Sequence, residues 1–143
     1  MRSSARGTTI VELAVTCAII GILAAVAVPR ALTAVERLSV RGAVQDVVLA
    51  LAAARAAATR RGEYISFIAD PLAGRVRVVG GGEILFERDL ARMRGVRLEA
   101  SRESLTFAPT GLGWGAANTT IVVSRGGRSD TITTSRLGRV RHN

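Results

Sequence analysis

Two groups of charged side chains have types and spacings that could do chemistry. Glu12 stands at the head of an apolar segment in which no residue from Leu13 to Val28 is charged. Near the other end, five arginines share the stretch after Asn118 with one acid, Asp130; they are Arg125, Arg128, Arg136, Arg139 and Arg141. A carboxylate inside a bilayer costs about 2.5–3.5 kcal/mol and requires a partner, whereas guanidinium groups neutralise phosphates. The sequence therefore predicts a cationic partner for Glu12 and an anionic partner for the arginines.

No set of residues suited to catalysis accompanies these charges. His142 is the only histidine, and a histidine so close to the end of a chain is usually just solvated. Cys17, the only cysteine, lies in the apolar segment, where we expect it to pack as a small apolar side chain. The sequence therefore has no ordinary Ser-His arrangement and no Cys/His cluster with metal-ligand spacing. Gly80–Gly82 also lacks the Lys and Ser/Thr of a phosphate-binding loop. We expect no enzyme activity, no cofactor and no metal.

The overall charge also favours an anionic partner. The 143 residues include 20 basic and 11 acidic ones, for a net charge of +9, and every basic residue is arginine. Hydrophobic residues make up 48% of the chain and aromatic ones only 3%, so Ala, Val and Leu must do most of the core packing. This length allows one compact domain beside the apolar segment.

The apolar segment is long enough to span a membrane. From Thr8 to Val28 it would form a helix of roughly 31 Å, about the thickness of a hydrocarbon core. Arg2 and Arg6 precede it, which predicts a cytoplasmic N-terminus. A secretory signal and an uncleaved membrane anchor are alternatives. The helical pattern continues past Pro29, however, and neither alternative explains Glu12.

The helical pattern extends to Arg61, where Gly62 is a natural stop. In its second half, one face is expected to pack against a sheet. This face carries mostly small residues and is interrupted by Asp46; it contains Leu32, Val35, Ser39, Ala43, Ala50, Ala53 and Ala57. The opposite face carries Arg30, Arg37, Arg41, Gln45 and Arg55.

After Gly62 the sequence changes to short β-type runs separated by turns. The predicted strands are EYISFIA (63–69), RVRVV (75–79), EILFE (83–87), VRLEA (96–100), SLTFA (104–108), TTIVVS (119–124) and DTITTS (130–135). A short helical or irregular piece is expected at 88–95 and a Gly-rich loop at 109–118. Trp114 in this loop should pack in the core or anchor the loop, and an exposed aromatic contact is the alternative. We predict one α+β domain in which an antiparallel sheet packs on the long helix.

The segment RGTTIVEL (6–13) resembles the class III signal of the type IV pilin and pseudopilin superfamily. The resemblance implies that prepilin peptidase cuts after Gly7, and that Thr8 becomes the first mature residue and is N-methylated. It also implies that Glu12 pairs with the N-terminal amine of a neighbouring subunit in a filament. Thr8 departs from the family, which usually has Phe at this position.

The same resemblance predicts the domain organisation. Residues 1–7 would be a leader peptide, and residues 8–29 a transmembrane and filament-core helix. Residues 30–143 would form a periplasmic globular domain that includes the second half of the helix. The protein would then cross the bacterial inner membrane once and enter a pilus or pseudopilus with other pilins.

Three further segments, ARAAATRRG (54–62), FAPTGLGWG (107–115) and SRLGRVR (135–141), are similar to the GspH/FimT family. This family holds the minor pseudopilin H of type II secretion, which sits near the tip of a pseudopilus. It also holds FimT, a minor pilin linked to natural transformation whose C-terminal Gly-Arg-x-Arg element binds DNA. GRVR (138–141) matches that element.

The favoured hypothesis is a FimT-like minor pilin that binds double-stranded DNA independently of its sequence. Arg125 and Arg128 bracket a Gly-Gly hairpin tip, where side chains should project into solvent, and Arg139 and Arg141 would share one face of a strand. The expected DNA-binding residues are Arg125, Arg128, Arg136, Gly138, Arg139 and Arg141. One alternative is a structural tip subunit of a secretion pseudopilus. Another reading of the arginines alone is an edge strand kept soluble by charge.

Overall fold

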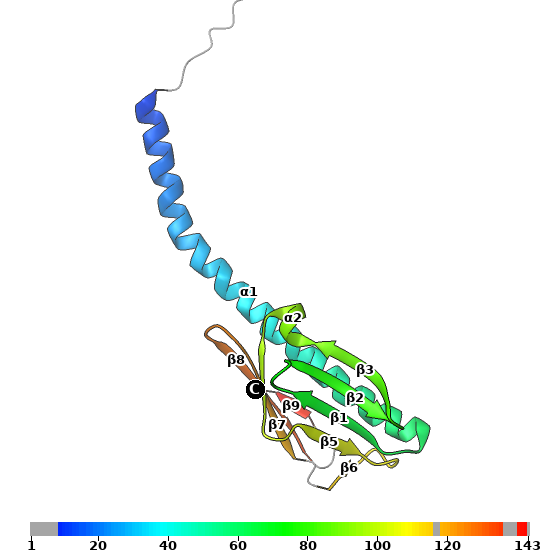
Figure 1. The fold of residues 1–143 in the computed structure, drawn as a ribbon. Coiled ribbons are helices and arrows are strands. Elements are labelled where there is room, and N and C mark those ends of the chain that lie inside the picture. Colours follow the sequence, from blue (N-terminus) through cyan, green and yellow to red (C-terminus); the bar gives the residue numbers. More distant parts are fainter. Residues whose placement is uncertain (1–8, 116–117, 136–139, 143) are drawn as a thin grey trace, which may run out of the picture. The chain divides into compact units, whose positions relative to one another are not determined.

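A computed structural model describes residues 9–115, 118–135 and 140–142 (Figure 1). The chain divides into two compact units, an N-terminal unit, Met1–Val35, and a globular unit, Glu36–Asn143. Helix α1 (Ile10–Arg61) contributes to both units. The predicted end of the long helix at Arg61 is therefore confirmed.

The helix begins with a hydrogen-bonded cap. The Oγ1 of Thr9 accepts a hydrogen bond from the backbone N–H of Glu12 at 3.2 Å, and Glu12 is the acidic residue of the first turn. A threonine followed three residues later by a glutamate is the spacing of a capping box, and a carboxylate there interacts favourably with the helix dipole. The cap uses the backbone of residue 12, so it does not depend on the glutamate side chain.

The N-terminal unit leaves its apolar side chains uncovered. All of its described residues are exposed, among them Ile10, Ile22 and Leu23. The segment from Ile10 is also long and apolar enough to cross a membrane. Such a surface is stable only against lipid or against other protein subunits.

The globular unit packs on one face of the second half of α1. The predicted small-residue face is confirmed at Ala43, Ala50 and Ala57, which are buried, but Leu32 and Val35 are exposed. The buried face also contains larger side chains that the prediction missed: Val40, Val44, Val47 and Leu51. The apolar surface of this half of the helix is wider than the small-residue face, so the sheets that cover it decide which residues are buried.

The single sheet predicted from the sequence is in fact two antiparallel sheets. The five-stranded sheet has the order β3-β2-β1-β5-β6 and the four-stranded sheet the order β4-β7-β8-β9. The strands of the first are β1 (Ile65–Asp70), β2 (Arg75–Gly80), β3 (Glu83–Asp89), β5 (Ser104–Phe107) and β6 (Gly113–Trp114). Those of the second are β4 (Arg97–Ala100), β7 (Thr119–Arg125), β8 (Arg128–Thr134) and β9 (Val140–His142). The division arises because β4 pairs with β7, while β5 returns to pair with β1.

Both sheets contribute to one hydrophobic core with α1. Its largest fully buried side chains include Phe67 and Phe107 from the five-stranded sheet, Ile121 and Ile132 from the four-stranded sheet, and Leu51 from α1. Every residue of this core lies between positions 40 and 132. The globular unit therefore carries a complete core of its own, as a unit able to fold alone requires.

Asp46, which interrupts the packing face of α1, has a specific partner. The Nε of Arg94, in helix α2 (Leu90–Arg94), donates to the Oδ2 of Asp46 at 2.7 Å. The Arg94 guanidinium lies over Gly42, where a Cβ would collide with it. A carboxylate on an otherwise apolar face is thus neutralised by the short helix that packs there.

Candidate functional sites

The β7–β8 hairpin carries the first two predicted DNA-binding residues. Arg125 and Arg128 pair across its tip and bracket Gly126 and Gly127, as predicted. The expectation that both side chains project into solvent is wrong for Arg125. Its Nη1 donates to the Oγ of Ser39 at 2.6 Å and also to the backbone carbonyl of Arg94.

The alternation along β7 explains this arrangement. Ile121 and Val123 point into the core, and Arg125 follows them on the same face of the strand. Its guanidinium therefore reaches α1 and the end of α2, and its hydrogen bonds connect the hairpin to both helices. We conclude that Arg125 is a structural residue of the globular unit.

We therefore predict a difference in stability between two alanine variants of the hairpin. Arg125→Ala is expected to lower the free energy of unfolding of residues 36–143 by about 1–3 kcal/mol, because two hydrogen bonds from a charged donor are lost. Arg128→Ala, the matched control at the exposed partner position, should change it by no more than about 0.5 kcal/mol. Urea unfolding followed by circular dichroism measures both. Equal stabilities of the two variants would contradict the structural role of Arg125.

The described arginines of the predicted cluster do not form one patch. Arg128 shares the face of β8 that carries the buried Ile132, whereas Arg141 pairs with the exposed Thr133 and so lies on the opposite face. The five residue steps from Arg128 to Thr133 also separate the two positions by roughly 17 Å along the strand. These two of the expected DNA-binding residues therefore do not lie side by side, because the alternation along β8 places them on opposite faces of the sheet.

The outward face of the four-stranded sheet is the better candidate for an anion-binding surface. Arg141 is exposed there on β9, an edge strand next to β8. Thr133 lies beside it, and Thr120 pairs with Thr133 from β7. Within the described part of the chain, neither Arg128 nor Arg141 takes part in an ion pair. Arginine and threonine are both common donors to phosphate oxygens.

Several predicted site residues lie outside the described ranges. These are Gly7 and Thr8 of the predicted cleavage site, and Arg136, Gly138 and Arg139 of the predicted DNA-binding element. Glu12 is described, and it is exposed in the first turn of α1. In residues 9–115, 118–135 and 140–142, no three His, Cys, Asp or Glu side chains are grouped to hold a metal ion.

Comparison with known proteins supports the resemblance seen in the sequence. The family model of the type II transport protein GspH matches residues 43–138. No sequence among curated proteins matches the chain. Two kinds of solved structure share its fold.

The type IV minor pilin FimU of Pseudomonas aeruginosa superposes with a TM-score of 0.62 at 20% sequence identity, covering 75% of this chain and 90% of FimU. The minor pseudopilin EpsH from the type 2 secretion system of Vibrio cholerae superposes with a TM-score of 0.57 at 13% identity, covering 73% of this chain and 96% of EpsH. The pilin-like fold, a long N-terminal helix packed against antiparallel sheets, is confirmed.

Proposed function

The chain belongs to the GspH family, and from this premise we propose that it is a FimT-like minor pilin that binds double-stranded DNA for uptake in natural transformation. Membership makes it a minor pilin or pseudopilin of a type IV pilus or a type II secretion filament. DNA binding is the specific function added here. Its ligand would be the phosphate backbone, which is the same for every base sequence.

One observation carries this proposal: Arg141 is exposed on an edge strand, beside a face with threonine hydroxyls and without an ion-pair partner in the described chain. Arg139 precedes it by two residues in GRVR and adds a second guanidinium to this element. Arg136 and Gly138 complete the element. Arg128 contributes at most a separate contact at the hairpin tip, and Arg125 none.

The decisive variant removes two positive charges from the GRVR element (138–141). Residues 36–143 should bind duplex DNA weakly and with a steep dependence on salt, because each contact releases counterions. Arg139→Gln/Arg141→Gln should make the slope of log affinity against log salt concentration less steep. The expected reduction is about the amount that two phosphate contacts contribute. Titration of a labelled duplex at several salt concentrations measures the slope.

The matched control removes the same net charge elsewhere on the globular unit. Arg88 on β3 and Arg92 on α2 are both exposed, and Arg88→Gln/Arg92→Gln should keep most of the parental slope. If both double variants lose affinity equally, binding follows net charge and not the C-terminal element. If the parent does not bind at low salt, the secretion function below is favoured.

The second candidate function is a structural tip subunit of a type II secretion pseudopilus. The match to the GspH model and the fold shared with EpsH favour it, as does the separation of Arg128 on β8 from Arg141 on β9. Deletion of the gene distinguishes the two functions. Loss of DNA uptake with intact protein secretion supports the minor pilin, and the reverse result supports the pseudopilin.

The N-terminal unit supplies membrane anchoring and assembly in either case. Residues 1–7 act as a leader removed by prepilin peptidase, and residues 8–29 cross the inner membrane before they enter the filament core. Residues 30–143 face the periplasm. The exposed apolar surface of α1 supports this assignment, because it needs lipid or neighbouring pilins around it. Glu12 is then the residue that pairs with the N-terminal amine of the next subunit.

A further inference from the structure

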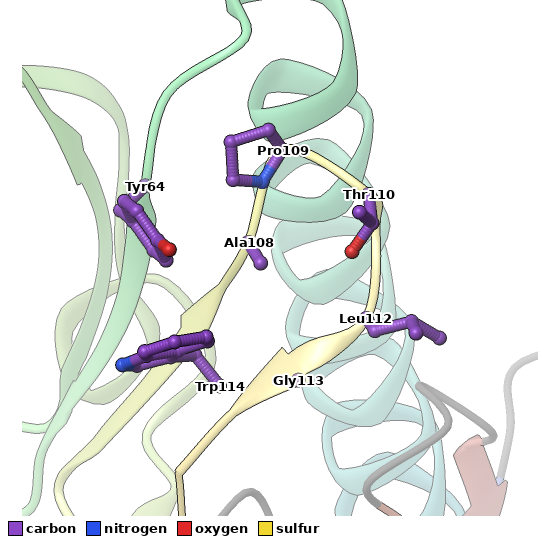
Figure 2. A pocket seen from close by; sticks show the side chains of 7 residues that line it. All are labelled: Tyr64, Ala108, Pro109, Thr110, Leu112, Gly113 and Trp114. Carbon is purple, nitrogen blue, oxygen red and sulfur yellow. The ribbon is translucent and has the colours of Figure 1, made fainter.

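An apolar notch opens between Tyr64, which directly precedes β1, and the loop that contains β6. It has a volume of about 440 Å³ and is lined by Tyr64, Ala108, Pro109, Thr110, Leu112, Gly113 and Trp114 (Figure 2). We call it the aromatic notch. The expectation that Trp114 packs in the core is wrong, because its side chain is 61% exposed and that of Tyr64 is 51% exposed. The two rings meet edge to face, with centroids 5.1 Å apart and planes at 68°.

Backbone hydrogen bonds define the shape of the loop that forms the notch. The N–H of Gly111 donates to the carbonyl of Ala108, and the N–H of Ala108 donates to the carbonyl of Leu112, both at 2.8 Å. Gly111 has a φ of +76°, and a Cβ there would lie 3.4 Å from the Nε of Arg55 on α1. Only glycine fits this left-handed turn without strain. The loop is therefore shaped by its own hydrogen bonds, with Gly111 next to Arg55 of α1.

The polar groups at and beside the notch can all donate hydrogen bonds. Figure 2 shows the hydroxyl groups of Tyr64 and Thr110 directed toward the space between the labelled side chains. No acidic residue lines the notch. Arg55 is exposed beside the loop, and in the described chain it has no ion-pair partner. The surroundings thus combine exposed aromatic faces, two hydroxyl groups and a guanidinium.

We infer that the aromatic notch binds an unpaired nucleobase of single-stranded DNA, with Arg55 at the adjoining phosphate. Aromatic side chains accept any base by stacking, and a nearby positive charge follows the backbone. The hydroxyl groups of Tyr64 and Thr110 can hydrogen-bond to the edge of the base. An aliphatic side chain of a protein partner would make no hydrogen bond to these hydroxyl groups. The inference rests on the proposed function only in taking DNA as the ligand, since the notch and Arg141 belong to different sheets.

Trp114 is the only tryptophan in the chain, so its fluorescence reports on this site alone. The full chain in detergent micelles is titrated with an oligothymidine strand and, separately, with a blunt duplex. The single strand should quench the emission, because a base stacks against or beside the indole. Tyr64→Ala and Arg55→Gln should each weaken the quenching titration on the order of tenfold. Arg88→Gln, which removes the same charge from β3, should not.

The outcomes separate this inference from the proposed function. If the duplex binds in the salt-dependent assay but the single strand does not quench Trp114, the inference fails and the proposed function stands. If the single strand quenches while Arg139→Gln/Arg141→Gln leaves duplex binding unchanged, the inference stands alone. An emission that changes with protein concentration in the absence of DNA would assign the notch to contact between copies of the chain, and would overturn the inference.

Discussion

A chain that carries Glu12→Val is expected to insert into the membrane and to lose its leader as the parent does, yet to enter filaments at no more than about a hundredth of the parental level. The substitution makes the membrane segment more apolar, which favours insertion. The neighbouring N-terminal amine, however, loses its counterion inside the filament. Removal of one partner from a buried charge pair costs about 3–5 kcal/mol, which corresponds to a factor of at least about a hundred in an equilibrium constant.

The structure makes this a clean test of the carboxylate. The cap of α1 uses the backbone N–H of residue 12 and the side chain of Thr9, so the helix start survives the substitution. Glu12→Gln retains the size of the side chain without its charge and should behave like Glu12→Val. The measurement is the ratio of the protein in sheared filaments to that in the membrane fraction. Normal incorporation of both variants would rule out docking through Glu12.

The second large effect concerns the leader. In cells that contain prepilin peptidase, we expect essentially all of the membrane-bound protein to lack Met1–Gly7 and to begin at Thr8. Gly7→Val should retain the leader almost completely, because the side chain occupies the position before the cut. Intact-mass analysis of the purified membrane form distinguishes the two species, and one additional methyl group in the mass would show N-methylation of Thr8.

Cells without the peptidase provide the control, since the parental protein should keep its leader there. A protein that still begins at Met1 in cells with an active peptidase would overturn the pilin processing described here. It would favour the uncleaved anchor, for which Glu12 has no explanation.

Local patterns predicted most of the secondary structure. Gly62 marks the end of α1, and the runs RVRVV and TTIVVS identify β2 and β7. The piece expected at 88–95 contains the short helix α2. These signals depend on neighbouring residues, which is why they can be read without a fold. The two-residue strand β6 was missed because it lies within a Gly-rich loop and owes its form to pairing with β5.

The pairing of distant segments was beyond the reach of such patterns. The sequence indicated a single sheet, because nothing in VRLEA identifies β7 as the partner of β4. Asp46 interrupts the packing face of α1 in the sequence, and nothing nearby identifies its partner Arg94, which lies 48 residues later. Each of these contacts depends on long-range packing.

The N-terminal features of this protein follow from the sequence itself: a membrane-length apolar helix, a carboxylate in its first turn and, before it, a segment that resembles a prepilin cleavage signal. They can be read because each depends on the order of adjacent residues. Only the tertiary structure decided how the arginines and the aromatic rings are used. Strand alternation turns Arg125 inward to Ser39 and Arg141 outward, and the Gly111 turn holds Trp114 at the surface beside Tyr64. Side-chain direction on a strand depends on which face the core covers, and that is set by the packing of the two sheets on α1.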